Sequence, residues 1–534
     1  MAEIHPNNCK MRQIHNVDFG VILVQAFAWN CAAWGKSMAR IAVLFSVEYY
    51  DAIDHPLTGW DKVPFGLSIV AGCLERAGHE VRCWVVCPRT SLHRVAHEIV
   101  HEFGCDMAAA SAVTTQFPLI ARLCQHIKDL KPSIPILLGG VHATVRAEKC
   151  IAHPAIDAIC VGEGEDAAVA WANAITNGEQ PSGIPGLWIK VPGQTEVERN
   201  PPAPFRTDLD EFPFMNYRHW ERWIDPRDRT LRVVVGRGCP YSCTYCSNHA
   251  LRRVQAGRYV RFRSPSNVLA EIRMIVERYP DLESIYLEIE TIGASVPWAL
   301  QLCDALAEFN AARERPIAFR ANLAVTNQLV QNEEQMHSLL SAFRRANLLT
   351  VNIGLESGSE RIRTEILRRP TYTNVALIQF CDVARQYGIS VVLYTLVGVP
   401  TETPAEAVET SKVARACDPL DVAKSIFYPY PGTKLHELST EMHLLDEEHL
   451  AVTAERSRVY LKLKDFPRWN VFFEYVFMTW RVFHHRRKTT WLARRMISTA
   501  FKIAPGLLIA SLHLREVLHP HRHVSSKVVP SRIA

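Results

Sequence analysis

The fold of this chain is decided by one stretch: Gly236-Arg237-Gly238-Cys239-Pro240-Tyr241-Ser242-Cys243-Thr244-Tyr245-Cys246. It directly follows an apolar run, Leu231 to Val235, which predicts a buried strand that ends in a loop. Three thiolates on one short loop can bind three irons of a four-iron cluster, and the fourth iron is then left without a protein ligand. An iron with an open coordination position can bind and reduce a small molecule.

Two other interpretations of these cysteines stay open at this point. The three thiols could be buried and unrelated, or they could supply part of a zinc site. A zinc site usually has a fourth Cys or His close in sequence, and His249 is the only near candidate. Because that spacing would be unusual for zinc, the sequence favours an iron–sulfur cluster.

The spacing CxxxCxxC, with an aromatic residue just before the last cysteine, resembles the signature of the radical S-adenosylmethionine (SAM) enzymes. The resemblance implies that the amino acid end of SAM binds the open iron and that reductive cleavage releases a 5'-deoxyadenosyl radical. Cys239, Cys243 and Cys246 would then be both the cluster ligands and catalytic residues. The resemblance also implies a partial (βα)6 barrel whose chemistry lies at the carboxyl ends of the strands.

Size and composition indicate the broad class of protein. A chain of 534 residues suggests about three domains, and 48% apolar residues are typical of a soluble globular protein. A net charge of +5 does not argue for nucleic acid, and 15 scattered cysteines indicate a reducing compartment. No apolar run reaches the roughly 18 residues of a membrane span, so we expect a cytoplasmic protein. Residues 1–37 are expected to be disordered or to precede the natural start at Met38.

Residues 38–200 alternate between strand-like and helix-like runs, which predicts a doubly wound, Rossmann-like parallel sheet covered by helices. The expected strands are Arg40–Phe45, Glu80–Val86, Asp106–Ala112, Ile134–Leu138 and Ile156–Val161, and the expected helices are Phe65–Ala77, Ser91–Phe103 and Pro118–Leu130. Ligands of such sheets bind beyond the carboxyl ends of the strands. No G-x-G-x-x-G follows the first strand, which argues against a dinucleotide.

The last two of these strands are each followed by a glycine-rich turn. The two turns resemble turns of the cobalamin-binding domain that precedes many radical SAM domains. They are Gly139-Gly140-Val141-His142-Ala143-Thr144 and Gly162-Glu163-Gly164-Glu165. The resemblance gives these candidate cobalamin contacts: Ser111, Thr114, Gly139, Gly140, His142, Thr144, Gly162, Glu163 and Gly164. A similar sheet without a ligand is the alternative. The segment containing His55 departs from the DxHxxG pattern of a cobalt-binding histidine, so the lower axial ligand is unassigned.

A Pro- and Asp-rich linker is expected over residues 201–230, and alternation resumes in a predicted radical SAM domain over residues 231–435. Its expected strands are Leu231–Val235, Ser284–Ile289, Ile317–Leu323, Thr350–Leu355, Ser390–Val397 and Lys424–Tyr428. Six strands separated by helical runs match the partial barrel of the radical SAM family.

The ends of these strands supply the candidate contacts to SAM: Tyr245, Glu288, Glu290, Arg320, Glu356, Ser357 and Gly398. By resemblance, Tyr245 would pack on the adenine and Glu356 would bind the ribose hydroxyls. Glu288 and Glu290 would bind the ammonium or ribose of SAM, or else pair with arginine. Arg320 would bind the carboxylate of SAM, although a structural ion pair explains it equally well.

Residues 436–534 are expected to form a mostly helical C-terminal region. Asn470 to Arg487 combines many aromatic residues with a basic cluster that begins at His484. This composition suits a helix that packs on the active-site domain, and it also suits peripheral contact with a membrane surface.

The sequence therefore predicts a cobalamin-dependent radical SAM methyltransferase that uses a 4Fe-4S cluster, SAM and cobalamin to methylate an unactivated carbon of a small molecule. A flavodoxin- or ferredoxin-type reductant is implied as a partner, and nucleic acid is not expected. The alternatives are a cyclase or rearrangement enzyme with the same cofactors and, from another class, a non-catalytic cobalamin sensor. A methylthiotransferase would need three more cysteines on suitable turns of the first domain, and Cys73, Cys83 and Cys105 do not lie on such turns.

Overall fold

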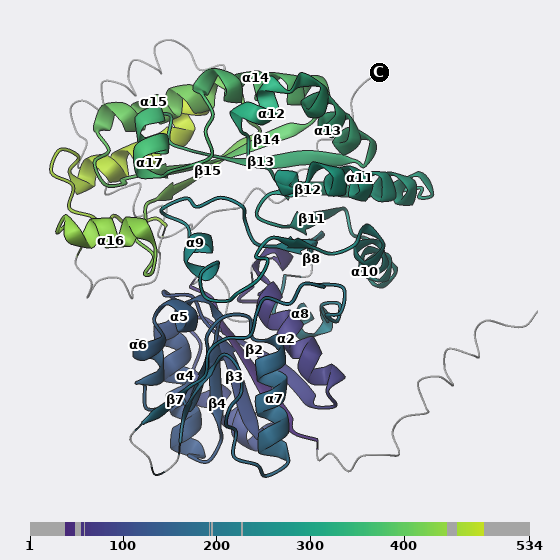
Figure 1. Cartoon of the computed structure of the whole chain (residues 1–534), viewed down its shortest axis with the longest axis vertical. Coiled ribbons are helices and arrows are strands. Elements are labelled where there is room, and N and C mark those ends of the chain that lie inside the picture. Colours follow the sequence, from purple (N-terminus) through teal and green to yellow (C-terminus); the bar gives the residue numbers. More distant parts are fainter. Residues whose placement is uncertain are drawn as a thin grey trace, which may run out of the picture. The chain divides into compact units, whose positions relative to one another are not determined.

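The structure is a computed structural model, and it describes residues 38–48, 55–57, 59–191, 193, 196–225, 228–445 and 456–484. The described residues from Ala39 onward form one compact unit that contains two large, mainly parallel sheets (Figure 1). The predictions for residues 1–37, and for the basic cluster beyond His484, lie outside the described residues.

The first sheet has the strand order β2-β1-β3-β4-β5-β6-β7. Its parallel strands are β1 (Arg40–Ser46), β2 (Glu80–Val86), β3 (Met107–Ser111), β4 (Ile136–Gly139) and β5 (Ala158–Cys160). The predicted doubly wound sheet is confirmed. An antiparallel hairpin of β6 (Leu187–Lys190) and β7 (Val197–Arg199), which the sequence analysis did not predict, extends it at one edge.

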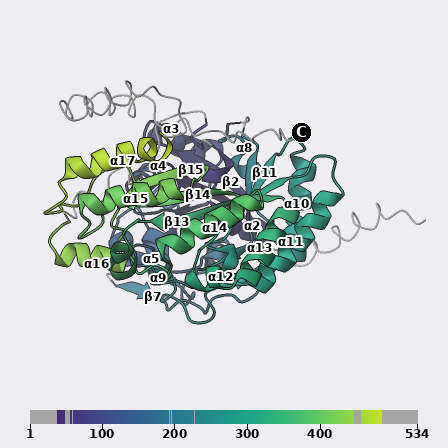
Figure 2. The ribbon, with the colours of Figure 1, turned by 90° about the horizontal axis from the view of Figure 1, so that it is seen from above.

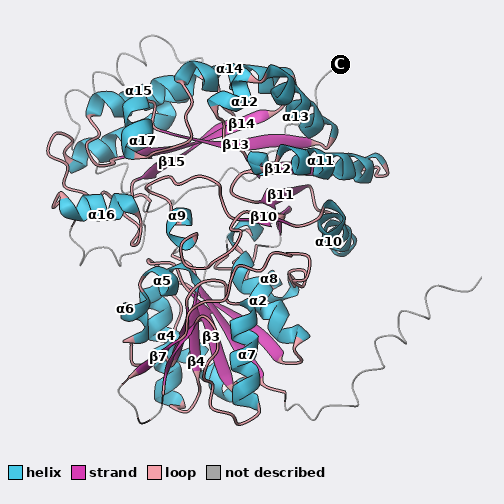
Figure 3. Ribbon diagram, in the orientation of Figure 1, coloured by secondary structure: helices cyan, strands magenta, loops and turns pink. Residues whose placement is uncertain are grey.

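Helices cover both faces of this sheet, as Figure 3 shows. The helices are α2 (Phe65–Arg76), α3 (Leu92–His97), η2 (Glu98–Glu102), α4 (Phe117–Leu130), α5 (Gly140–Val145), α6 (Ala147–Ile151) and α7 (Glu165–Thr176). Successive side chains of a strand point to opposite faces. Ile41 and Val43 of β1 accordingly belong to one apolar core, whereas Ala42 and Leu44 belong to another. This is why the strands read as continuous apolar runs.

The predicted linker is a packed segment. It contains α8 (Arg218–Glu221), whose Trp220 is fully buried, and Tyr217 packs edge-on against Trp60 of η1 (Trp60–Lys62) with ring centroids 5.9 Å apart. The hydroxyl of Tyr217 donates a hydrogen bond to the carbonyl oxygen of Arg232 at 2.5 Å. The linker thus contributes to the same apolar core as both sheets.

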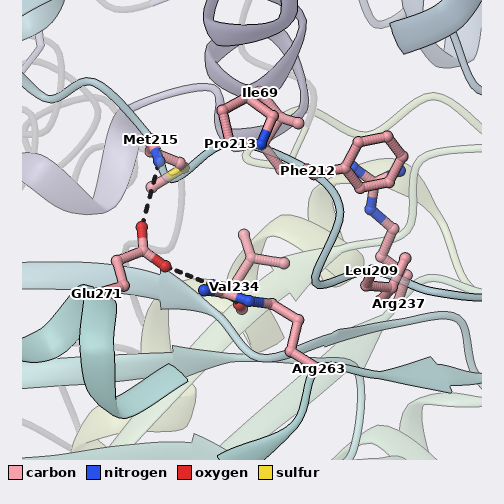
Figure 4. Close-up of a pocket in the computed structure, with 9 residues that line it drawn as sticks. All are labelled: Ile69, Leu209, Phe212, Pro213, Met215, Val234, Arg237, Arg263 and Glu271. Carbon is pink, nitrogen blue, oxygen red and sulfur yellow. Dashed lines mark hydrogen bonds and ion pairs between the residues drawn. The ribbon is translucent and has the colours of Figure 1, made fainter. Parts of the chain in front are cut away.

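A small cavity of about 20 Å³ lies beside this linker (Figure 4). Arg263 pairs with Glu271 in its wall, and Glu271 accepts a hydrogen bond from the backbone nitrogen of Met215 at 3.2 Å. A volume of this size holds about one water molecule. The cavity is therefore too small for a cofactor.

The second sheet has the order β15-β14-β13-β12-β11-β8, and all its neighbours are parallel. The strands are β8 (Thr230–Val234), β11 (Ser284–Glu288), β12 (Ala318–Asn322), β13 (Leu348–Glu356), β14 (Ser390–Val397) and β15 (Asp421–Ile426). The six strands that the sequence predicts are confirmed, and their sequential order is that of a partial (βα)6 barrel.

Helices pack on one face of the second sheet (Figure 2). They are α10 (Pro265–Arg278), α11 (Val296–Ala311), α13 (Glu333–Arg345), α14 (Asn374–Gln386) and α15 (Pro404–Ala416). Shorter elements are β9 (Gly236–Arg237), α9 (Asn248–Leu251), β10 (Arg261–Phe262), η3 (Ile292–Ala294), α12 (Asn327–Gln331) and η4 (Ile362–Ile366). Ile285 and Leu287 of β11 are fully buried on the helix-covered face, whereas the alternate residues Tyr286 and Glu288 are polar.

The C-terminal part contains α16 (Lys434–Glu441) and α17 (Arg468–Phe483). Helix α17 packs against α15 and β15, and it buries Val471, Met478 and Val482. Its apolar side is thus used for packing within the chain. Among the described residues, no helix is both long enough and apolar enough to cross a membrane.

Candidate active site

The cysteine loop begins at a position that only glycine can occupy. Strand β9 pairs with β10, and Gly238 then adopts a φ of 87°. A Cβ atom at Gly238 would lie 2.3 Å from the carbonyl oxygen of Tyr259. Because this contact and this φ both exclude a side chain, Gly238 fixes the point where the chain turns toward Cys239.

Hydrogen bonds shape the rest of the loop. The backbone nitrogen of Cys246 donates to the carbonyl oxygen of Cys243 at 3.1 Å. The amide nitrogen of Asn248 donates to the sulfur of Cys246 at 3.5 Å, and the hydroxyl of Tyr259 donates to the amide oxygen of Asn248 at 2.5 Å. Tyr259 therefore orients the amide so that its NH2 group faces the sulfur. Hydrogen bonds to sulfur are one way in which proteins set the potential of an iron–sulfur cluster.

His249 has no nitrogen left for a metal. Its Nε2 accepts a hydrogen bond from the backbone nitrogen of Lys434 at 3.2 Å, so its Nδ1 carries the proton and donates to the carbonyl oxygen of Cys243 at 3.0 Å. The one histidine that could have completed a zinc site thus supports the backbone of the loop instead.

The thiols themselves suit a cluster better than a single ion. In the described part of the chain, no three His, Cys, Asp or Glu side chains converge closely enough to hold one metal ion. The thiolates of a zinc site all lie about 2.3 Å from the same ion, whereas each cysteine of a four-iron cluster binds a different iron. Burial raises the pKa of Cys239 to about 12 and also raises the pKa values of Cys243 and Cys246. Binding of a cluster would therefore displace protons from them.

Tyr245 and Glu356, two predicted contacts of SAM, lie together in the structure. The hydroxyl of Tyr245 donates to Oε1 of Glu356 at 3.0 Å, and Arg369 donates to that hydroxyl at 2.6 Å. Arg369 also lies 3.4 Å from Oε1 of Glu356. The register of β13 shifts between Gly354 and Glu356, which has a φ of 59°, and this irregularity turns the carboxylate toward the cysteine loop.

Ser357 and Gly398 both have close protein neighbours, and their contact with SAM stays a prediction. Ser357 is fully buried, and its hydroxyl accepts a hydrogen bond from the backbone nitrogen of Ser359 at 3.2 Å, so it supports the turn. Gly398 has a φ of 82°, and a Cβ atom there would lie 2.7 Å from Val471 of α17. Glu402 accepts a hydrogen bond from the backbone nitrogen of Gly398 at 2.6 Å, and burial raises the pKa of Glu402 to about 8.

Glu288, Glu290 and Arg320, the other predicted contacts of SAM, lie in three different environments. Glu288 forms an ion pair with Arg232 at 2.8 Å, which is the structural alternative that the sequence left open. Glu290 is exposed and lies near enough to Cys239 and Cys246 to raise their pKa values. Arg320 has a buried Nε atom without a hydrogen-bond partner. The ion pair that the sequence left open as an alternative for Arg320 is absent from the described residues.

The nine predicted cobalamin contacts gather at the carboxyl ends of β3, β4 and β5. Gly140 has a φ of 90°, and a Cβ atom there would lie 2.5 Å from the hydroxyl of Ser111. The hydroxyl of Thr144 donates to the carbonyl oxygen of Gly140 at 3.0 Å and accepts from the backbone nitrogen of Gly162 at 3.1 Å. Thr144 therefore links the two glycine-rich turns by hydrogen bonds. Gly140 is the first residue of helix α5, whereas the sequence predicted a turn here.

His142 of α5 keeps one nitrogen without a partner. Its Nδ1 lies 3.1 Å from the hydroxyl of Thr114, its ring packs on Phe117, and its Nε2 is buried with no hydrogen-bond partner in the described structure. Burial lowers the pKa of His142 to about 4, so the ring is neutral near pH 7. A buried, unpaired nitrogen among small residues fits a polar ligand group at these strand ends. His55, by contrast, is exposed.

Glu163 of the second turn pairs with Arg261 of β10 and with Arg237 of β9, the strand that leads into the cysteine loop. Arg261 of β10 donates to both of its carboxylate oxygens, at 2.6 and 2.9 Å. Arg237, two residues before Cys239, lies 3.2 Å from Glu163 and donates to Glu165 at 2.5 Å. The carboxylate that we expected to contact cobalamin is thus already paired. The structure ties the predicted cobalamin turn directly to the predicted cluster loop.

Three residues with large roles in this arrangement carry no recognisable signal in the sequence. Arg237 was quoted only as part of the cysteine stretch, and Arg261 and Arg369 carried no motif. Their partners lie 72, 98 and 124 positions away, for Arg237–Glu165, Arg261–Glu163 and Arg369–Tyr245. No local pattern could have signalled these pairs.

Comparisons with known proteins agree with both halves of the site. The B12 binding domain matches residues 59–172, and the Radical SAM superfamily matches residues 233–414. Both matches fall within the predicted domains, whose boundaries stay predictions.

Individual relatives cover most of the chain. It is 26% identical over 398 residues to an uncharacterized methyltransferase of Pyrococcus horikoshii, covering 73% of this chain and 81% of the relative. The chain is also 26% identical over 396 residues to the anaerobic magnesium-protoporphyrin IX monomethyl ester cyclase of Rubrivivax gelatinosus. This match covers 72% of the chain and 68% of the relative. The radical SAM methyltransferase TsrM of Kitasatospora setae, solved with cobalamin and a 4Fe-4S cluster, superposes with a TM-score of 0.59 at 18% identity, covering 76% and 78%. At that identity the similarity establishes the fold.

Proposed function

Because this chain belongs to the cobalamin-dependent radical SAM enzymes, we propose that it transfers a methyl group to an unactivated carbon of a small-molecule substrate. The observation that carries the proposal is the ion-pair network between Glu163 and Arg261 and Arg237. It joins the turn that would hold cobalamin to the loop that would hold the cluster. A protein that uses the two cofactors in one reaction must hold them in a fixed relation, and supporting contacts of this kind help to do so.

The bound cofactors would supply a carbon-centred radical and a transferable methyl group. The protein's part is to hold and orient them. Cys239, Cys243 and Cys246 would bind the cluster, and Gly238 fixes where their loop begins. Tyr245, held by Glu356 and Arg369, would pack against SAM. His142 would offer its unpaired nitrogen to cobalamin.

Electron supply and location complete the proposal. Reductive cleavage of SAM requires an electron donor, so we infer a flavodoxin- or ferredoxin-type partner. The described residues of α17 use their apolar side for packing, which supports a structural role for this helix over a membrane-binding one.

A cyclase is the second candidate, because a cyclase and a methyltransferase match this chain at the same 26% identity. The two reactions differ in product mass. Methylation replaces a hydrogen by a methyl group and adds one methylene unit to the substrate, whereas cyclisation adds no carbon.

The test is anaerobic reconstitution of the full chain with iron, sulfide and cobalamin, followed by incubation with a reductant and SAM labelled in its methyl group. We expect 5'-deoxyadenosine and labelled methyl in cobalamin or product. Formation of 5'-deoxyadenosine with no methyl in either would refute methyl transfer and favour the cyclase.

Variants at two cysteines separate the cluster from general thiol effects. Cys243→Ala should lose the cluster iron and all SAM cleavage while it still binds cobalamin. Cys303→Ala removes another buried thiol, in α11, and should keep both. A full iron content in Cys243→Ala would contradict the assignment.

A further inference from the structure

The second sheet has a polar face opposite its helices. Side chains that alternate with the buried core residues along the strands point to this face. It carries Arg232 of β8, Tyr286 and Glu288 of β11, Arg320 and Asn322 of β12, Asn352 of β13 and Tyr394 of β14. In a barrel-like sheet this face looks toward the interior, where substrates of such enzymes bind.

Most of these polar groups have protein partners. Arg232 pairs with Glu288 at 2.8 Å. The hydroxyl of Tyr286 donates to the amide oxygen of Asn322 at 2.5 Å and accepts from the amide of Asn352 at 3.0 Å. Neutral hydrogen bonds and a balanced ion pair leave no net charge on this part of the face.

Among the charged groups of this face, Arg320 is the exception. Within the described residues its side chain has no hydrogen bond and no ion pair, and its Nε atom is buried without a partner. Its strand places it between Tyr286 of β11 and Thr350 of β13, near the middle of the sheet. A guanidinium that is partly removed from water and lacks an anion is costly unless a ligand supplies one.

The anion is better supplied by a substrate than by SAM. Arg369 lies beside the cysteine loop, where SAM is predicted to bind, because it donates a hydrogen bond to the hydroxyl of Tyr245 at 2.6 Å. Arg320 stands two residues before the end of β12, which is about 7 Å below the strand end. It lies near Tyr394, whose side chain is 37% exposed and whose pKa it influences. Arg320 thus faces an accessible part of the polar face, below the cysteine loop.

We propose that Arg320 binds an oxyanion group, a carboxylate or a phosphate, of the methyl acceptor. The identity of that ligand as the acceptor depends on the proposed function, whereas the binding of an oxyanion does not. A planar guanidinium can donate two parallel hydrogen bonds to either group, which would also fix the orientation of the substrate.

The test uses the anaerobically reconstituted full chain with cobalamin bound. Inorganic phosphate and, separately, acetate are titrated by calorimetry at constant ionic strength. Three variants are compared with the wild type: Arg320→Gln, Arg320→Lys and the control Arg315→Gln. Arg315 is exposed in the loop that precedes β12, so its replacement changes the net charge equally.

We expect saturable binding of at least one anion by the wild type and by Arg315→Gln. Arg320→Gln should bind it at least about tenfold more weakly, because charge-assisted hydrogen bonds are lost. Arg320→Lys keeps the charge but loses the planar guanidinium, so its anion affinity should lie between those of the wild type and Arg320→Gln. If Arg320→Gln does not fold, the comparison is made with Arg320→Lys. Equal affinities in all four proteins, or no binding of either anion by the wild type, would overturn the proposal.

SAM binding is measured in the same proteins from the change that SAM causes in the EPR spectrum of the reduced cluster. Arg320→Gln should bind SAM as the wild type does. A tenfold loss there would assign Arg320 to the carboxylate of SAM and overturn the substrate role. Absence of SAM cleavage in the wild type would refute the proposed function. The anion titrations would still test whether Arg320 binds an oxyanion, because that binding does not depend on SAM cleavage.

Discussion

Replacing Glu163 by Gln should destabilise the protein far more than the same change at Glu148. Both carboxylates accept two hydrogen bonds from one arginine, Arg261 for Glu163 and Arg199 for Glu148. The pairs differ in burial. The exposed fractions of the side chains are 2% and 21% for Arg261 and Glu163, against 47% and 69% for Arg199 and Glu148.

The expected magnitudes follow from that difference. Glu163→Gln removes a charge from a pair whose arginine is fully buried, and losing one partner of a buried pair costs about 3 kcal/mol or more. Arg237 loses one of its two carboxylates at the same time but keeps Glu165. An exposed pair contributes about 1 kcal/mol or less, because water and salt screen it. We expect Glu148→Gln to fall in that range.

The assay is urea unfolding of both variants and the wild type, followed by tryptophan fluorescence in one buffer, together with cobalamin affinity. The urea midpoint should fall clearly for Glu163→Gln and change little for Glu148→Gln. Only Glu163→Gln should weaken cobalamin binding, since its turn is held by Arg261. Equal midpoints for the two variants would refute the claim that this network stabilises the site.

Three further predictions concern single positions. Burial lowers the pKa of His142 to about 4 from an ordinary value of 6.5. As the pH falls between these values, the unfolded chain takes up a proton that the folded chain does not, so the folded protein loses stability. His142→Gln should reduce this loss, measured as the difference between the urea midpoints at pH 7 and pH 4.5. Gly238→Ala should sharply lower the iron and sulfide retained after reconstitution, because its methyl group would meet the carbonyl oxygen of Tyr259 at 2.3 Å, and retention at the wild-type level would contradict this. Gly140→Ala should weaken cobalamin binding at least about tenfold in an absorbance titration and leave iron content unchanged, because its methyl group would displace the hydroxyl of Ser111.

The sequence predicted the two sheets well because their strands are short apolar runs separated by helices of ordinary length. Thr403, for example, caps α15 in a capping box with Glu406, and Pro404 begins that helix, so its start is legible in the sequence. The hairpin of β6 and β7 was missed because its strands are as short as β4 and β5 but lack their continuous apolar residues. Strand β6 reads Leu-Trp-Ile-Lys and β7 reads Val-Glu-Arg.

The sequence allowed candidate site residues to be named where chemistry follows from local spacing, but not where the arrangement depends on distant pairs. The spacing of Cys239, Cys243 and Cys246 is local, and so are the glycine-rich turns. The arginines that fix Glu163, and Arg369 beside Tyr245, come from remote parts of the chain. A carboxylate after a strand looks the same in sequence whether it will face a ligand or an arginine. This is why Glu163 was expected to contact cobalamin and why both alternatives stayed open for Glu288.

The measurement that bears most directly on the whole account is EPR spectroscopy of the anaerobically reconstituted, reduced chain before and after addition of SAM. We expect the signal of a reduced four-iron cluster whose spectrum changes when SAM occupies the iron that no cysteine binds, and we expect no such signal in Cys243→Ala. A bound zinc ion in place of iron, or a cluster signal that SAM leaves unchanged, would contradict the account.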